Sequence, residues 1–115
     1  MDSILTSTKK LAGLTEEYDH FDPDIIMYIN HTFMTLKQIG VGPKEGFIIS
    51  DESEIWTDFI PDNTVIREAV KSYMGEKVRL KFDPPLNSTH LDALRKSVDE
   101  AEWRLRLEAE TSSES

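Results

Sequence analysis

Residues 22–43 read DPDIIMYINHTFMTLKQIGVGP, and they contain the clearest helix signal in the chain. Asp22 can accept hydrogen bonds from the free N–H groups of a first helical turn. Pro23 suits that turn, because its missing N–H has no helical partner in any case. Apolar residues then follow at positions 26, 29, 33 and 36, a 3-4-3 spacing, and Ile25, Met34 and Ile39 widen the set. Their spacing indicates a helix with one buried stripe.

The helix should end at Gly40-Val41-Gly42-Pro43, because two glycines and a proline are costly inside a helix. The segment that follows leaves two structures open. Phe47-Ile48-Ile49 could be one arm of a short β-hairpin, or residues 44–60 could form an irregular loop. Within it, residues 53–59 could make a helical turn that points three apolar side chains inward: Ile55, Trp56 and Phe59.

A short helix is predicted at the start of the sequence. Asp2 or Ser3 can cap it, and Gly13 can end it by adopting the left-handed conformation without a Cβ penalty. Its neighbouring faces carry Ile4, Leu5, Thr8, Leu11 and Ala12.

A long helix is predicted after the loop, from a cap at Asp62 or Asn63 to about Phe82. Asp83-Pro84-Pro85 should stop it, since proline cannot continue a helix. Gly75 interrupts this helix at a cost of about 1 kcal/mol relative to alanine, and a glycine there could permit close contact with another helix. The apolar face of the helix comprises Val65, Ile66, Ala69, Val70, Tyr73, Met74 and Val78.

The last predicted helix starts near Ser88 or Thr89. Its apolar positions follow a heptad-like spacing, which suits packing along another helix of the same chain or of a neighbour. These positions are Leu91, Leu94, Val98, Ala101 and Leu105, with Trp103 and Leu107 off to one side. The fold class is therefore mainly α, a small bundle of about four helices in one domain over residues 1–107. Residues 108–115 are polar and acidic and are expected to form a flexible tail.

The composition fits one soluble globular domain and excludes several classes of site. The chain has 115 residues, which suffices for a single core. It contains no cysteine, so disulfides, thiolate zinc sites and cysteine nucleophiles are excluded. No apolar run reaches the roughly 18 residues of a membrane span, and the start of the chain does not resemble a signal peptide. We therefore expect no membrane association, and a protein that stays in the cytoplasm where it is made.

Charge is distributed unevenly along the chain. The net charge is −9, and residues 15–62 hold eleven acidic residues against two lysines. Residues 63–98 hold seven basic residues against four acidic ones. An acidic surface repels phosphate, so the charge argues against a conventional nucleic-acid-binding protein. The acidic segment could be a solvated face, or it could meet the basic helix of a second copy.

Signals for catalysis or metal binding are weak. The three histidines lack the spacing of a metal site, and no Gly-rich phosphate loop or nucleophile elbow occurs. The run His20-Phe21-Asp22-Pro23-Asp24 could bind a divalent ion, but a helix cap explains Asp22 more simply. We therefore expect no catalytic residues, no metal and no cofactor.

The candidate functional residues are those of an interface between proteins. Lys77 and Lys81 share one helical face, and Trp103 could be either an aromatic anchor at an interface or part of the core. The candidate interface comprises Lys71, Lys77, Lys81, Trp103, Arg104, Leu105 and Leu107. The residues expected to shape the helix ends are Asp22, Pro23, Gly40, Gly42, Pro84 and Pro85.

Several stretches together resemble the small head–tail connector, or adaptor, proteins of long-tailed bacteriophages. The resemblance covers about residues 4–107, and it rests on the combination of segments rather than on any single one. The segments are Ser7-Thr8-Lys9-Lys10-Leu11, Phe21-Asp22-Pro23-Asp24-Ile25-Ile26-Met27-Tyr28-Ile29-Asn30, Gln38-Ile39-Gly40-Val41-Gly42-Pro43, Trp56-Thr57-Asp58-Phe59-Ile60, Lys81-Phe82-Asp83-Pro84-Pro85 and Glu102-Trp103-Arg104-Leu105.

The resemblance implies a structural role in the virion. Proteins of this family form a ring, typically of twelve copies, docked beneath the portal protein in the neck. The ring extends the DNA channel without reading its sequence, and it gives the head-closure (stopper) or tail protein a surface to bind. The family has no catalytic residues. If residues 108–115 become ordered against the portal, deleting them should weaken portal binding and leave the melting temperature unchanged.

Two other classes of function stay open at this point. The chain could be a small acidic helical interaction or regulatory module outside a virion, including a DNA mimic that competes with DNA for a basic partner. It could also be an enzyme or a metal protein, which metal analysis of the purified protein would test.

Overall fold

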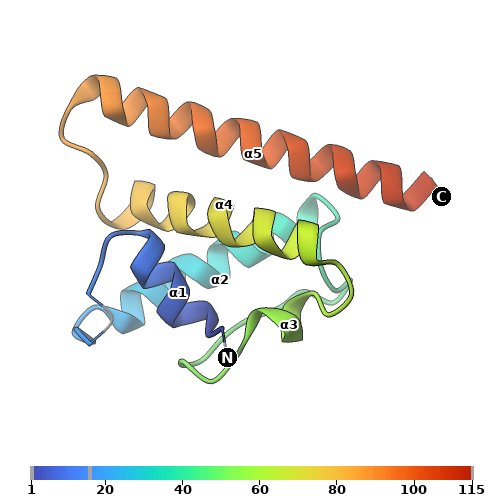
Figure 1. Cartoon of the computed structure of the whole chain (residues 1–115), viewed down its shortest axis with the longest axis horizontal. Coiled ribbons are helices and arrows are strands. Elements are labelled where there is room, and N and C mark those ends of the chain that lie inside the picture. Colours follow the sequence, from blue (N-terminus) through green and yellow to red (C-terminus); the bar gives the residue numbers. More distant parts are fainter. Residues whose placement is uncertain (1, 16, 115) are drawn as a thin grey trace.

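Helix α1 begins at a capping residue that the sequence supplies. The computed structural model describes residues 2–15 and 17–114, with side chains as far as Thr111, and within these ranges the chain forms five helices and no β-strand (Figure 1). Helix α1 spans Ile4–Leu11, and the Ser3 Oγ accepts a hydrogen bond from the Thr6 N–H at 3.2 Å. It ends as predicted, with Gly13 at φ +83°.

Helix α2 spans Asp22–Gln38, and its start corrects one prediction. Asp22 is the first helical residue, and no side chain caps the helix. The Asp22 carboxylate instead binds the Lys9 ammonium at 2.8 Å, because Lys9 is nearly fully buried and its charge needs a partner. Lys9 also donates to the Tyr18 carbonyl at 2.8 Å, which ties α1 to the start of α2. Pro23 lies in the first turn, as predicted.

The buried stripe of α2 is rotated slightly from the predicted one. Thr32 belongs to it, and its hydroxyl donates to the Tyr28 carbonyl at 2.9 Å. Ile26 is only half-buried, and Met34, which we placed beside the stripe, is exposed because it lies on the side of α2 that no element covers. The fully buried residues are Ile25, Ile29, Thr32, Phe33 and Leu36.

The end of α2 is closed by a glycine. Gly40 adopts φ +91°, and its N–H donates to the Lys37 carbonyl at 3.1 Å. The next N–H, of Val41, donates to the Leu36 carbonyl at 2.8 Å. These two bonds are those of a Schellman motif, which needs a left-handed residue after the helix. The predicted helix end is confirmed.

Residues 44–60 form an irregular loop and the short helix α3, so the β-hairpin alternative is wrong. Side chains hold the loop in place of a strand ladder: the Asn30 amide donates to the Ile49 carbonyl at 3.0 Å and accepts from the Ile49 N–H at 2.8 Å. A single β-bridge joins Ser3 to Ile55. Helix α3 spans Trp56–Phe59, and both of these aromatic residues are buried, as predicted. The Trp56 Nε1 donates to the Ser7 Oγ at 2.7 Å.

Helix α4 lies in the middle of the molecule. It spans Thr64–Phe82, and the Asn63 Oδ1 caps it by accepting from the Ile66 N–H at 3.1 Å. Helix α4 packs against α1, α2, α3 and α5. Val65 and Ala69, which we assigned to its apolar face, are exposed, because they lie on the side of α4 away from these helices. The buried positions are Val70, Tyr73, Met74, Gly75 and Val78.

Helix α5 is the longest element, and its main contact with another helix is with α4 (Figure 1). It spans Ser88–Glu114, so it continues past residue 107, where we expected a flexible tail to begin. The Asn87 Oδ1 accepts from the N–H groups of Thr89 and His90 at 2.9 and 3.1 Å, so Asn87 caps the helix that we expected to start near Ser88. The division of the chain at residue 107 stays a prediction.

Candidate assembly surface

One side of α5 is buried and the opposite side is open. Val98 and Leu105 are fully buried, and Leu94, Ala101 and Ala109 are partly buried against the core. Consecutive helical residues are rotated by about 100°, so residues two positions from Leu105 point away from α4. Trp103 and Leu107 occupy those positions and are 58% and 40% exposed. We call these two residues the outer pair.

The structure separates the candidate interface residues of α5. Trp103 lies outside the core, which removes the alternative that it is a core residue of the chain. Leu105, which we placed at the interface, is only 3% exposed, because it belongs to the seam that packs on α4. Arg104 is exposed and binds the Glu100 carboxylate one turn earlier at 2.6 Å. These positions leave Trp103, Arg104 and Leu107 available to a partner.

The candidate lysines of α4 take part in ion pairs within the chain. Lys71 binds both Asp2 and Glu68, the latter at 3.3 Å, and the hydrogen bond that it donates to the Asp2 carboxylate raises the pKa of the Lys71 ammonium. Lys77 lies 3.8 Å from the Glu102 carboxylate of α5. Lys71 and Lys77 therefore stabilise contacts of α4 with the N-terminal segment and with α5.

Lys81 is exposed near the end of α4. It lies with Lys77 at a shallow hollow of about 190 Å³ between α2 and α4, together with Tyr28, His31, Thr32 and Thr35. Lys77 and Lys81 therefore lie close together on one face of α4, as the sequence predicts.

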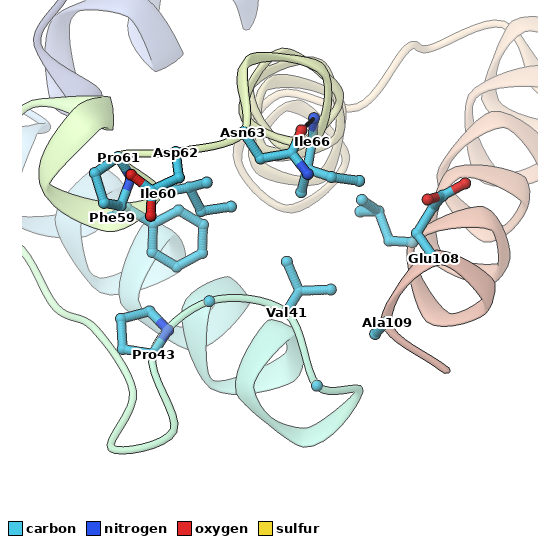
Figure 2. A pocket seen from close by; sticks show the side chains of 13 residues that line it. Val41, Pro43, Phe59, Ile60, Pro61, Asp62, Asn63, Ile66, Glu108 and Ala109 are labelled. Atoms are coloured by element: carbon cyan, nitrogen blue, oxygen red, sulfur yellow. Dashed lines mark hydrogen bonds between the residues drawn. The ribbon is translucent and has the colours of Figure 1, made fainter. Parts of the chain in front are cut away.

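A second surface feature lies where α5 passes the turn after α2 and the segment between α3 and α4. It is an open groove of about 360 Å³, which we call the α5 groove (Figure 2). Val41 and Phe59 project into it, and Glu108 and Ala109 border it on the α5 side (Figure 2). Its full lining is Gly40, Val41, Gly42, Pro43, Phe59, Ile60, Pro61, Asp62, Asn63, Ile66, Leu105, Glu108 and Ala109.

The α5 groove has no signature in the sequence, because its walls come from three separate parts of the chain. Gly40 and Gly42, which the sequence predicts to end a helix, are among the residues that line it. Both have φ +91°, and a Cβ on Gly42 would lie 2.4 Å from the Phe59 ring. The glycines therefore let the turn approach α3 and α5 closely enough to form the groove floor.

Pro84 and Pro85 act as predicted. Helix α4 ends at Phe82, and the Asp83 N–H donates to the Arg79 carbonyl at 2.8 Å. The two prolines that follow carry the chain away from α4, toward the start of α5 (Figure 1).

The ionisable groups give no sign of a reaction centre. Among the described residues, no group of three or more His, Cys, Asp or Glu side chains is placed to hold a metal ion. Hydrogen bonds from Ser53 hold the pKa of the exposed Asp51 carboxyl below its usual range. Partial burial acts to raise the pKa of Glu54, but N–H donors from Ser50 and Asp51 outweigh it and lower that pKa. Both carboxylates order a surface turn.

None of the helices in residues 2–15 and 17–114 is both long enough and apolar enough to span a bilayer.

Comparison with known proteins identifies the family. Residues 4–112, nearly the whole chain, match the family model described as phage connector protein. No curated protein and no solved structure matches the chain. The matched family is a family of structural virion proteins rather than of enzymes. The chain belongs to the phage connector protein family.

Proposed function

We propose that this connector forms a ring, with twelve copies as the expected number, docked beneath the portal in the neck of a tailed phage. The ring extends the DNA channel and presents a surface to the head-closure or tail protein. The observation that carries the proposal is the family match over residues 4–112.

The open packing of α5 supports assembly with other proteins. Helix α5 packs mainly on α4, and this leaves the outer pair and the exposed Arg104 on its free side. Tryptophan and arginine are the residues that most often carry binding energy at protein interfaces. A monomeric protein gains little by keeping such residues on one helix face.

The charge of the chain supports a passage for DNA rather than a DNA-binding site. The net charge is −9, and much of it lies in residues 15–62. Acidic side chains that line a channel repel the phosphate backbone and so let DNA slide. Only the side chains that face the lumen act in this way.

The experiment is reconstitution with the portal protein of the same phage. The purified chain is mixed with assembled portal, and native mass spectrometry and negative-stain electron microscopy follow. We expect one added ring whose mass equals that of twelve chains. A portal that stays bare, or that binds one or two isolated copies, would contradict the proposal.

A further inference from the structure

The outer pair and the α5 groove are both apolar. The outer pair is a tryptophan and a leucine one helical turn apart on the exposed side of α5. The α5 groove has apolar walls from Val41, Phe59 and Ile66 and a volume of about 360 Å³. A pocket of about 300 Å³ or more is in the range that binds small apolar groups.

The two surfaces lie on opposite sides of the same helix. Leu105, Glu108 and Ala109 border the groove, whereas Trp103 and Leu107 point the other way. A chain therefore cannot place its own outer pair in its own groove. It can place that pair in the groove of a neighbour and still accept the outer pair of another copy. Such a head-to-tail contact closes into a ring when the rotation between copies allows it.

The charges at the two surfaces are of opposite sign. Among the residues that line the α5 groove, the ionisable ones are Asp62 and Glu108, both acidic and exposed. Arg104 and Arg106, both exposed, flank the outer pair along α5. Arg104 already binds Glu100, but an exposed ion pair of this kind contributes little, so the guanidinium can exchange its partner. Lys37, Lys44 and Glu110 line an adjoining hollow, which shares Gly40, Gly42, Pro43 and Ala109 with the α5 groove.

A symmetric pairing of two α5 helices fits the surface less well. Such a pairing would need apolar side chains along the whole outer face of the helix. The positions that share this face with the outer pair include Lys96 and Glu100, both exposed. The apolar part is confined to one end, which suits insertion into a pocket.

We propose that Trp103 and Leu107 of one copy insert into the α5 groove of the next copy, with Arg104 and Arg106 facing Asp62 and Glu108 of that neighbour. The partner is a second copy of this chain, and the contact is heterologous. This inference rests on the proposed ring and names the surfaces that join its subunits.

Cysteine cross-linking of the full chain tests the contact directly, because the natural sequence contains no cysteine. Two variants are made, Leu107→Cys in the outer pair and Asp62→Cys at the groove rim. They are mixed at high concentration under mild oxidation and compared with each variant alone. The control is Ala93→Cys, which is also exposed on α5 but lies 14 residues, or about 21 Å, before Leu107.

We expect a disulfide-linked dimer from the mixture of Leu107→Cys and Asp62→Cys. The yield should be at least tenfold higher than from the mixture of Ala93→Cys and Asp62→Cys. A dominant dimer from Leu107→Cys alone would show that two α5 helices pair symmetrically, and it would overturn the inference. Equal yields from all mixtures would overturn it as well.

A second variant separates this inference from the proposed function. Trp103→Ala should reduce the mixed cross-link at least tenfold and abolish the ring on the portal. Its circular dichroism and melting temperature should stay close to those of the parent chain, because Trp103 lies outside the core. If Trp103→Ala still forms the full ring on the portal, the inference fails and the proposed function stands. If the parent chain forms no ring on the portal, the proposed function fails, whatever the cross-links show.

Discussion

At the residue scale, Gly42 shows how one missing Cβ shapes the groove floor. Alanine at Gly42 or at Gly13 would have to adopt a left-handed backbone, at about 1–2 kcal/mol. Only at Gly42 would the new Cβ also meet a side chain, the Phe59 ring at 2.4 Å, whereas nothing lies within 4 Å at Gly13. We expect Gly42→Ala to reduce the free energy of unfolding by about 1–3 kcal/mol more than Gly13→Ala does. Denaturant titration of both variants measures the difference, and equal losses would contradict the packing.

Tyr73 gives the chain a dependence on alkaline pH. Burial raises the pKa of Tyr73 above its ordinary value of 10, and the Glu102 carboxylate, which accepts from its hydroxyl at 3.1 Å, acts in the same direction. A pKa raised in the folded state gives stability that is complete below about pH 10 and is lost as pH rises through the folded value. We expect the stability of the parent chain to fall above pH 10.

The matched control for this effect is Tyr73→Phe. It should cost about 1 kcal/mol at neutral pH because the hydrogen bond is lost, and its stability should fall less steeply above pH 10. Since the Lys71 pKa is also raised and its ion pairs are unchanged in this variant, the comparison isolates the tyrosine. Parallel pH profiles for the two proteins would count against the assignment.

At the scale of the elements, α1 and α4 approach each other at a glycine. A Cβ on Gly75 would lie 2.6 Å from the Leu11 Cβ. Alanine is favoured over glycine inside a helix by about 1 kcal/mol, but overlap of this kind costs about 1–3 kcal/mol. We expect Gly75→Ala to destabilise the chain, and to become neutral or stabilising when Leu11→Gly removes the opposing Cβ. Thermal unfolding of the single and double variants tests the coupling, and a stabilising Gly75→Ala in the parent chain would refute it.

The end of α5 calls for a revised truncation experiment. From the sequence we expected removal of residues 108–115 to leave the melting temperature unchanged. Ala109 is instead partly buried against the core, and a Cβ on Gly40 would lie 3.3 Å from its Cβ. Removing residues 108–115 should therefore lower the melting temperature, by about 4 °C for each kcal/mol of lost packing. Removing only residues 111–115 should leave it unchanged, because Glu108 and Ala109 remain.

Portal binding of the two truncations tests the role of the tail. If the tail contacts the portal, both truncations should bind the portal more weakly than the full chain. If deleting residues 111–115 leaves portal binding undiminished, the tail either contacts the portal only through residues before 111 or does not contact it.

At the scale of the whole molecule, stability should decrease from α4 outward to α5. Helix α4 packs against four other helices, whereas α5 packs mainly on α4, and its fully buried residues as far as Thr111 are Val98 and Leu105. Local opening is easiest where few apolar contacts are lost. We expect backbone amides of α5 to exchange hydrogen at least tenfold faster than those of α4 in the free protein. Assembly should slow exchange in α5 most, and hydrogen-exchange mass spectrometry before and after assembly measures this. Equal protection of both helices in the free protein would contradict the expectation.

The candidate surface could be predicted only in part. An aromatic residue on a charged helix, such as Trp103, is visible in the sequence, but its exposure is not, since a residue beside the seam can still be covered by another part of the chain. Leu105 lies in the seam, as its spacing predicts, and also borders the α5 groove. The α5 groove joins the turn after α2, the segment after α3 and the end of α5, and no local pattern links these parts of the chain.

The sequence by itself determined the mainly helical class, the helix ends at Ser3, Gly40 and Asn63, and the absence of thiol chemistry. Ser3, Asn63 and Gly40 act through hydrogen bonds to backbone groups within a few residues, so their roles are local and readable. Only the tertiary structure decided that Asp22 binds Lys9, that residues 44–60 form an irregular loop, and that α5 has an open side. Each of these depends on which groups from distant parts of the chain compete for the same atoms or cover the same face. The sequence does not give the distances in space between such groups.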